Sequence, residues 1–385
     1  TVSAIDILRI MPCMVSSIVL FKKRLRTCPI PTDIPLSKRK VSNYHPFLTT
    51  FATKSATRAN VGYILFNFGF MKLTTLPIAA LVTAIASCTT YENTEIPVER
   101  ITTAEALASS PDGAHTIMRA LGADDDTAAT QQWVYRFGQS EAMRIFGHDA
   151  DSIMPSLRQF SSDIGRLHRN MASILPDAPP LRQIYATVIP YSQSVILMSD
   201  TNGITIIVGL NHYLGADYEG YSSFPAYRRA RKTPEWMTRD IAEAIVRTVY
   251  PLESDAHPTL LQRMLYEGAV AAALVRLMPD NEARAIGMTD DDFAQLYRSE
   301  KEIWQRMAGS DLLFDRSERT ASSLLHKGSP GTVIGRDVPP MAGRLTGWRI
   351  AESYLKANPE ATPESLLQPT FYLSDKTLRE AKYMP

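Results

Sequence analysis

The segment ITIIVGLNHYLG, residues 204–215, is rich in β-branched residues and favours a strand over a helix. Two shorter β-branched segments precede it, IYATVIP at 184–190 and SVILMSD at 194–200, and SDTNG at 199–203 is a typical turn. The pattern predicts a small antiparallel sheet at residues 182–216, in the order strand, strand, turn, strand.

The sequence on both sides of this sheet has helical periodicity. Apolar residues recur every three to four positions in MPSLRQFSSDIGRLHRNMASIL (154–175) and again in TRDIAEAIVRTVYP (238–251). We therefore expect helices over residues 101–178 and 217–385. The predicted fold class is α+β, mostly helical, with the small antiparallel sheet packed on helices in a single globular domain, residues 101–385.

Residues 71–88, MKLTTLPIAALVTAIASC, resemble a bacterial lipoprotein signal peptide, although they lie inside the chain. A lysine follows the methionine, a largely apolar run of 13 residues comes next, and Ile-Ala-Ser-Cys matches a lipobox. The run is too short for a membrane-spanning helix, which needs ~20 residues. The sequence predicts a signal peptide at 71–87, cleavage between Ser87 and Cys88, lipidation of Cys88 with acyl chains such as palmitate, and a tether at 88–100.

Residues 1–70 differ from the remainder in charge. They contain ten Lys or Arg residues and two acidic residues, which leaves 31 basic and 38 acidic residues in the rest of the chain. The net charge of +1 therefore hides a basic segment and an acidic body. We interpret 1–70 as a non-native upstream extension or a disordered basic segment, with Met71 as the initiator. A basic arm ahead of an uncleaved anchor is the alternative.

Several enzyme classes are not supported by the motifs. The sequence has no HExxH, GxSxG, GxxxxGK[ST] or GxGxxG motif, and the three cysteines do not have metal-binding spacing. We therefore predict no metal and no cofactor, and no small-molecule substrate is identified. The acidic body also argues against nucleic-acid binding.

Three segments occur in an order that resembles the gliding-motility lipoprotein B (GldB) family of Bacteroidetes. They are GLNHYLGADYEGYSSFPAYRRARKTPEWMTRDIAEAIVR (209–247), LLQRMLYEGAVAAALVRLMPD (260–280) and GRLTGWRIAESYLKANPE (343–360). The similarity extends over residues 146–385, and the lipobox agrees with it. The resemblance implies an envelope lipoprotein of the gliding motility machinery or of the linked type IX secretion apparatus.

The order of elements is also similar to that of zinc-dependent proteases of the gluzincin type, which implies a zincin-like domain. That resemblance places Ala242 and Val246 where the histidine ligands belong, Glu243 at the general-base position and Glu267 at the third-ligand position. Apolar residues cannot bind zinc, so the resemblance implies a degenerate, non-catalytic scaffold.

A candidate pseudo-active site or cleft therefore consists of Glu243, Glu267 and His212. A carboxylate in the apolar helix around Glu267 needs a partner, because burying it unpaired is costly. Arg228, Arg229, Arg231 and Arg247 are the candidates for that partner. The alternatives are that Glu243 faces solvent and that His212 has a surface or capping role.

The segment from Tyr218 to Trp236 is a candidate interaction loop, because aromatic and arginine residues are enriched at binding hot spots. A loop that only covers the helical core is the alternative. The candidate residues are Tyr218, Tyr221, Phe224, Tyr227, Arg228, Arg229 and Trp236.

We therefore expect a non-catalytic envelope lipoprotein, anchored in a membrane by its lipid and facing the periplasm, with protein partners in the envelope. The first alternative is a degenerate or atypical metallopeptidase with a metal site built from His212, His257, Glu243 and Glu267. The second is a substrate-binding lipoprotein, which the near absence of alternating strand and helix patterns argues against.

Overall fold

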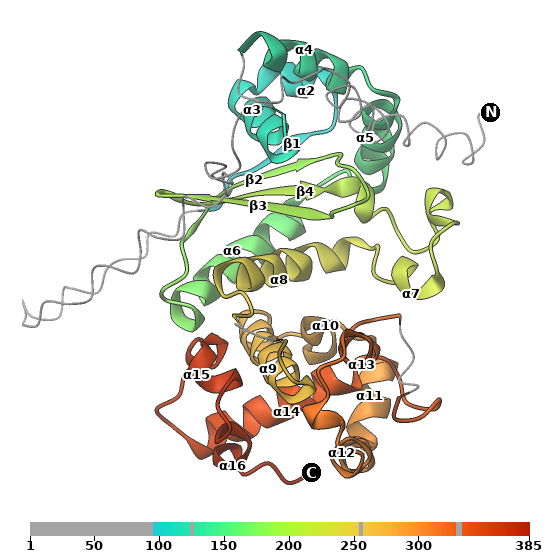
Figure 1. Ribbon diagram of the computed structural model, residues 1–385. Coiled ribbons are helices and arrows are strands. Elements are labelled where there is room, and N and C mark those ends of the chain that lie inside the picture. The colour runs from blue at the N-terminus through green and yellow to red at the C-terminus, as the bar shows by residue number, and fades with distance from the viewer. Residues whose placement is uncertain (1–94, 124–126, 254–256, 329–332) are drawn as a thin grey trace, which may run out of the picture. The chain divides into compact units, whose positions relative to one another are not determined.

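A four-stranded mixed sheet lies between helices in the computed structural model (Figure 1). Its strands are β1 (Val98–Ile101), β2 (Leu181–Thr187), β3 (Val195–Asp200) and β4 (Gly203–Gly209), in the order β1-β2-β4-β3. Strands β1 and β4 are parallel to β2, and β3 is antiparallel to β4. The expected mostly helical α+β fold is confirmed, but the sheet is mixed and not antiparallel throughout.

The hairpin of β3 and β4 is the part of the sheet that was predicted correctly. Its turn is local: Asp200 Oδ1 accepts hydrogen bonds from the backbone N–H of Asn202 at 2.7 Å and of Gly203 at 3.2 Å. Gly203 has a φ of +137°, which favours glycine. Strand β4 then enters between β3 and β2, where both its faces are buried, as its continuous apolar sequence requires.

Strand β1 was not predicted and lies at the end of the stretch expected to be a tether, residues 88–100. It pairs with β2 from Val98 to Ile101, and Thr187 donates a hydrogen bond of 2.6 Å to the carbonyl oxygen of Ile101. A four-residue edge strand has too few residues to show a period of two.

The structure describes residues 95–123, 127–253, 257–328 and 333–385. These residues fall in one compact unit, Asn93–Pro385. The predictions for residues 1–70, the signal peptide at 71–87, Cys88 and the first part of the tether lie outside the described residues.

Helices cover both faces of the sheet. On one side lie α2 (Ala104–Ser109), α3 (Pro111–Ala120), α4 (Thr127–Gly138) and α5 (Glu141–Ile153), and on the other lie α6 (Arg158–Ile174) and α8 (Met237–Val249) (Figure 1). The apolar stripe of α6 is buried as its periodicity predicts, with Phe160, Ile164, Leu167 and Met171 each at most 5% exposed.

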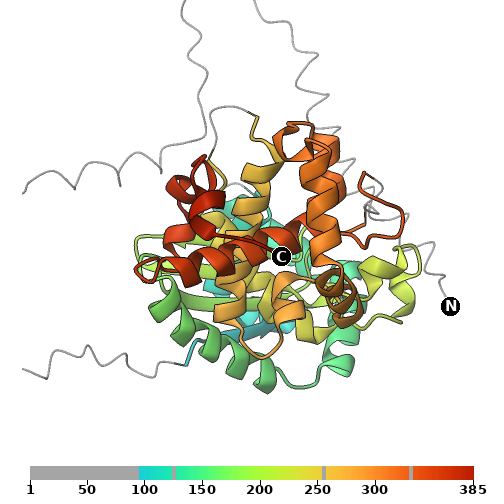
Figure 2. The same ribbon diagram turned by 90° about the horizontal axis from the view of Figure 1, so that it is seen from below.

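A helical body follows α8 in the chain, and Figure 2 shows its gold-to-red helices facing the viewer. Its centre is α9 (Leu260–Leu277), whose N-terminus has a capping box made by Thr259 and Gln262. Helix α14 (Ala342–Ala357) packs across α9. The other helices are α10 (Glu282–Ile286), α11 (Asp290–Arg298), α12 (Glu300–Gly309), α13 (Glu318–Leu325), α15 (Pro369–Tyr372) and α16 (Thr377–Ala381).

Two glycines let α9 and α14 approach to backbone contact. A Cβ atom on Gly347 would lie 1.9 Å from the carbonyl oxygen of Met264, and one on Gly268 would lie 2.1 Å from that of Gly347. Only glycine fits at such a contact. The crossing therefore depends on both residues.

Short helical turns connect these elements. They are η3 (Leu210–His212), η4 (Glu219–Tyr221), α7 (Ala226–Arg229), η5 (Pro234–Trp236), η6 (Leu312–Phe314) and η7 (Ser365–Leu367). Among the described residues, none of the helices combines the length and the hydrophobicity that a membrane-spanning helix needs.

Candidate functional site

The carboxylates of Glu243 on α8 and Glu267 on α9 meet, and two arginines bridge them. Arg247 donates hydrogen bonds of 2.8 and 2.7 Å to Glu267 and of 3.1 and 3.0 Å to Glu243. Nη1 of Arg344 donates to both carboxylates, at 2.9 Å to Glu243 and 3.0 Å to Glu267. Arg239 also pairs with Glu243. We call these five side chains the ion cluster.

The ion cluster keeps both carboxyl groups ionised. Burial alone would raise their pKa values, but Arg239, Arg344 and Arg247 together hold the pKa of Glu243 well below its usual range. Arg344 and Arg247 lower the pKa of Glu267 in the same way. The side chains of Glu267 and Arg344 are only 7% and 5% exposed, so water screens these interactions little.

Local geometry explains how the cluster forms. Arg239, Glu243 and Arg247 are four residues apart on α8 and share one face of that helix. Glu267 immediately precedes Gly268, the residue of α9 at the contact with α14, and Arg344 lies three residues before Gly347. The close helix crossing therefore brings Arg344 against Glu267.

The two positions that the resemblance to zinc proteases assigns to histidine ligands face the protein interior. Ala242 and Val246 are completely buried. Glu243 lies between them in the sequence, and its carboxylate points to Arg239, Arg247 and Arg344. Each oxygen of the two carboxylates of the ion cluster accepts a hydrogen bond from an arginine.

The hydrogen bond of His212 is made to the backbone and not to a member of the ion cluster. The residue is 4% exposed, and its Nε2 donates to the carbonyl oxygen of Pro190 at 3.2 Å. Burial, with help from the charge of Lys232, lowers the pKa of His212 to about 3, so the ring is neutral near pH 7. His257 is exposed. In the part of the chain that the structure describes, no three His, Cys, Asp or Glu side chains are grouped to hold a metal ion.

The candidate interaction loop has two different sets of residues. Tyr221 is completely buried and Trp236 is 7% exposed. The hydroxyl of Tyr221 donates to the carbonyl oxygen of Asn211 and accepts from the N–H of Leu214. These contacts tie Tyr221 to the segment that follows β4, so Tyr221 has a structural role.

The other loop residues are closer to solvent. Tyr218 is half-buried and donates from its hydroxyl to Asp149. Arg229 is half-buried, whereas Tyr227 and Arg228 are exposed. Phe224, Tyr227 and Arg228 line an open cleft of about 330 Å³, so the loop is one wall of a cavity.

The cleft has a strongly cationic lining. Among the described residues that line it, the basic side chains are Arg228, Arg231, Lys232 and Lys327, and the only carboxylate is that of Asp240. Its aromatic wall includes Tyr191, Tyr213, Phe224 and Tyr227. His212 is also part of the lining. Asp240 accepts hydrogen bonds from Arg231 at 3.1 Å, from Arg239 at 3.1 Å and from Tyr213 at 2.9 Å. Through Arg239, Asp240 connects the cleft to the ion cluster.

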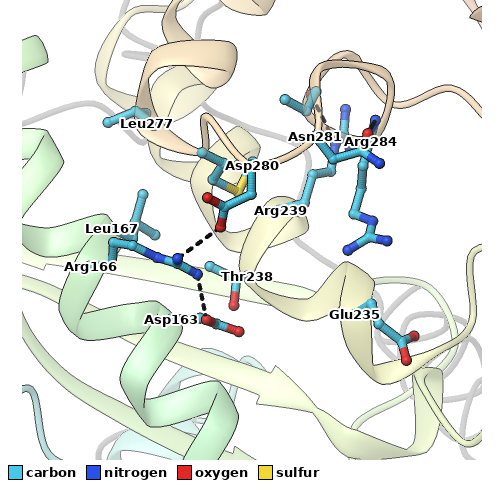
Figure 3. Close-up of a pocket in the computed structure, with 12 residues that line it drawn as sticks. Asp163, Arg166, Leu167, Glu235, Thr238, Arg239, Leu277, Asp280, Asn281 and Arg284 are labelled. Carbon is cyan, nitrogen blue, oxygen red and sulfur yellow. Dashed lines mark hydrogen bonds and ion pairs between the residues drawn. The ribbon is translucent and has the colours of Figure 1, made fainter.

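A second, smaller pocket of about 80 Å³ lies between α6, α8 and the end of α9 (Figure 3). Its Arg166 bridges Asp163 at 2.7 Å and Asp280 at 2.8 Å, as the dashed lines show. Because Arg166 and the two aspartates already neutralise one another, we do not propose this pocket as an ion-binding site.

The structure brings together two of the three candidate pseudo-active-site residues, Glu243 and Glu267, and places His212 in the neighbouring cleft. Of the four arginines considered as partners of Glu267, Arg247 is bonded to it. Sequence reasoning missed Arg239, Arg344 and Lys327. An arginine within the small and apolar residues of GRLTGW was a usable signal for Arg344, since a buried guanidinium needs acidic partners.

Comparison with known proteins matches the chain to a protein family. The family model described as gliding motility protein GldB matches residues 94–385. No curated protein and no solved structure matches the chain significantly. The matched segment is more than half of the chain and contains the sheet, the ion cluster and the cleft. The chain therefore belongs to the gliding motility protein GldB family.

Proposed function

We propose that this protein is a non-catalytic accessory component of a gliding motility machinery, of the kind linked to type IX secretion, and that it works through contacts with envelope proteins. Family membership implies a part in gliding motility. The observation that supports a non-catalytic role is the ion cluster, in which arginines engage both Glu243 and Glu267. The relation to zinc peptidases stays a prediction.

The name of the matched family model marks the family as lipoproteins, which implies a lipid-anchored envelope protein. We propose Cys88 as the lipidated residue, after removal of a signal peptide at 71–87, and a periplasm-facing body. Two or more acyl chains on one residue would hold the body firmly, because each buried CH₂ contributes ~0.8 kcal/mol.

Replacing Cys88 by serine should release the protein from the membrane and abolish its contribution to gliding, because the hydroxyl cannot accept the lipid through a thioether. The measurement is detergent-phase partitioning and intact mass of the native protein, together with colony spreading of a gliding strain that has only this copy. Thr90→Ser, two residues after the proposed lipidation site, is the matched control and should behave as wild type. A Cys88→Ser protein that still partitions into detergent would disprove the anchor.

Replacing Glu243 by glutamine should reduce gliding only in proportion to the amount of folded protein, because the proposed function needs no general base. The measurement is spreading against protein level, with metal analysis of the purified wild type, and Glu235→Gln on the surface is the control. Loss of gliding at a wild-type protein level, or stoichiometric zinc that disappears in Glu267→Ala, would favour an atypical metallopeptidase instead.

A further inference from the structure

We propose that the cationic cleft binds a phosphate group, with Tyr191 and Lys327 as donors to its oxygens. The first observation is that both side chains have a buried polar atom without a hydrogen-bond partner among the residues that the structure describes. These atoms are the Tyr191 hydroxyl oxygen and the Lys327 Nζ, and both residues line the cleft. Buried donors without acceptors are rare in folded proteins and call for a ligand or ion that supplies the acceptor.

The second observation is the charge of the lining. Four basic side chains face one carboxylate, that of Asp240, which is already shared between Arg231, Arg239 and the Tyr213 hydroxyl. Asp240 therefore cannot also neutralise Lys327. The lining has an excess of positive charge that a dianion would balance better than a monoanion.

The position of Lys232 adds a third observation. Its Nζ lies 4.8 Å from the ring centre of Tyr221, 4.9 Å from that of Phe224 and 5.2 Å from that of Tyr191. The rings hold the ammonium group beside the cleft without neutralising it. Lys232 can therefore still attract an anion, and the aromatic wall offers an apolar surface to the group that bears the phosphate.

The combination favours a phosphate monoester over a carboxylate. A phosphate has three terminal oxygens for Lys and Arg donors and a charge between −1.5 and −2 at neutral pH. The volume of about 330 Å³ leaves space for an organic group next to the phosphate. The same chemistry is present in a soluble phosphate ester and in the headgroup of a phosphate lipid, so the experiment must separate these sources.

The lysines also predict a pH dependence. Burial lowers the pKa of Lys327 to about 8, with Arg231 and Arg239 lowering it and Asp292 opposing them. Burial also lowers the pKa of Lys232 to about 8. The charge of Arg228 lowers this pKa further, whereas the charge of Asp240 raises it. His212 stays neutral throughout this range. Binding requires the protonated lysines, so affinity should be greatest near roughly pH 7 and fall as the pH rises through 8.

The test is calorimetric titration of the full chain with phenyl phosphate, using benzoate and inorganic phosphate as comparisons. We expect phenyl phosphate to bind more tightly than benzoate, and Tyr191→Phe and Lys327→Met each to weaken it about tenfold or more. Neither variant should lower the thermal midpoint in phosphate-free buffer, because each removes an unpaired polar group. Lys301→Met, on the exposed face of α12, is the control and should bind as wild type.

Vesicles distinguish the two sources of phosphate. Binding to phosphatidic acid in phosphatidylcholine vesicles that is lost in Lys327→Met would assign a lipid headgroup, whereas binding of phenyl phosphate alone would assign a soluble ester. Equal affinity for benzoate and phenyl phosphate would overturn the proposal. Unchanged phenyl phosphate affinity in Tyr191→Phe and Lys327→Met would also overturn it, whatever their stability.

Discussion

Replacing Arg344 by methionine is expected to destabilise the folded domain by about 3–5 kcal/mol, the usual cost of removing one partner from a buried ion pair. Arg344 donates to both Glu243 and Glu267 and is only 5% exposed. Its loss leaves two neighbouring carboxylates with fewer positive charges, and they then repel each other more strongly. The free energy of unfolding from urea titration measures the effect.

Arg276→Met is the matched control for this prediction. Arg276 also bonds a glutamate, Glu352, through both Nη atoms at 2.6 and 3.0 Å, but these side chains are 30% and 27% exposed. We expect a cost of about 1 kcal/mol or less there, because solvent screens the pair. Equal costs for the two variants would mean that the ion cluster is not the buried network described above.

The same variant should show a characteristic dependence on pH. The pKa values of Glu243 and Glu267 are lowered in the folded protein, so their stabilising contribution is present above about pH 4.5 and is lost as the pH falls through the folded pKa values. Protonation also removes the repulsion between the carboxylates. The deficit of Arg344→Met relative to wild type should therefore shrink as the pH is lowered below about 4.5.

Replacing Gly347 by alanine should cost about 3 kcal/mol or more, because the added Cβ would overlap the carbonyl oxygen of Met264 at 1.9 Å. No side-chain rotation can relieve a contact between a Cβ and a backbone oxygen. The two helices α9 and α14 must separate, which also moves Arg344 away from Glu267. Thermal and urea denaturation followed by circular dichroism measure the loss.

Gly165→Ala on α6 is the control for a glycine in a helix. The nearest atom to its added Cβ would be Nη1 of Arg169 at 3.6 Å, an ordinary van der Waals contact. Because alanine is the better helix former by ~1 kcal/mol, this change should be neutral or stabilising. A Gly347→Ala protein with wild-type stability would contradict the close crossing of α9 and α14.

Local patterns predicted the elements whose neighbours in sequence are also their neighbours in space. The stripe of α6 and the hairpin of β3 and β4 depend on contacts within a few residues, so periodicity and turn residues are sufficient to find them. The parallel pairing of β2 with β1 and β4 depends on segments far apart in the chain. A strand has the same local pattern whichever neighbour it joins, so the mixed sheet could not be derived from it.

The candidate site divides in the same way. The sequence by itself determined that Glu267 lies in an apolar helix and must have a partner, because an unpaired buried carboxylate is too costly. It also determined that residues 218–236 combine aromatic and basic side chains. The tertiary structure decided which arginines pair with Glu267. Arg344 is 77 residues away in the sequence and contacts Glu267 only because the glycines let α14 pack closely on α9.

The cleft was likewise decided by the tertiary structure. Tyr191, Lys232 and Lys327 come from three separate segments, and none of them has an unusual local sequence. Tyr191 and Lys327 each have a buried polar atom without a hydrogen-bond partner among the described residues. This feature exists only after the chain has folded, because in the unfolded chain water satisfies each group.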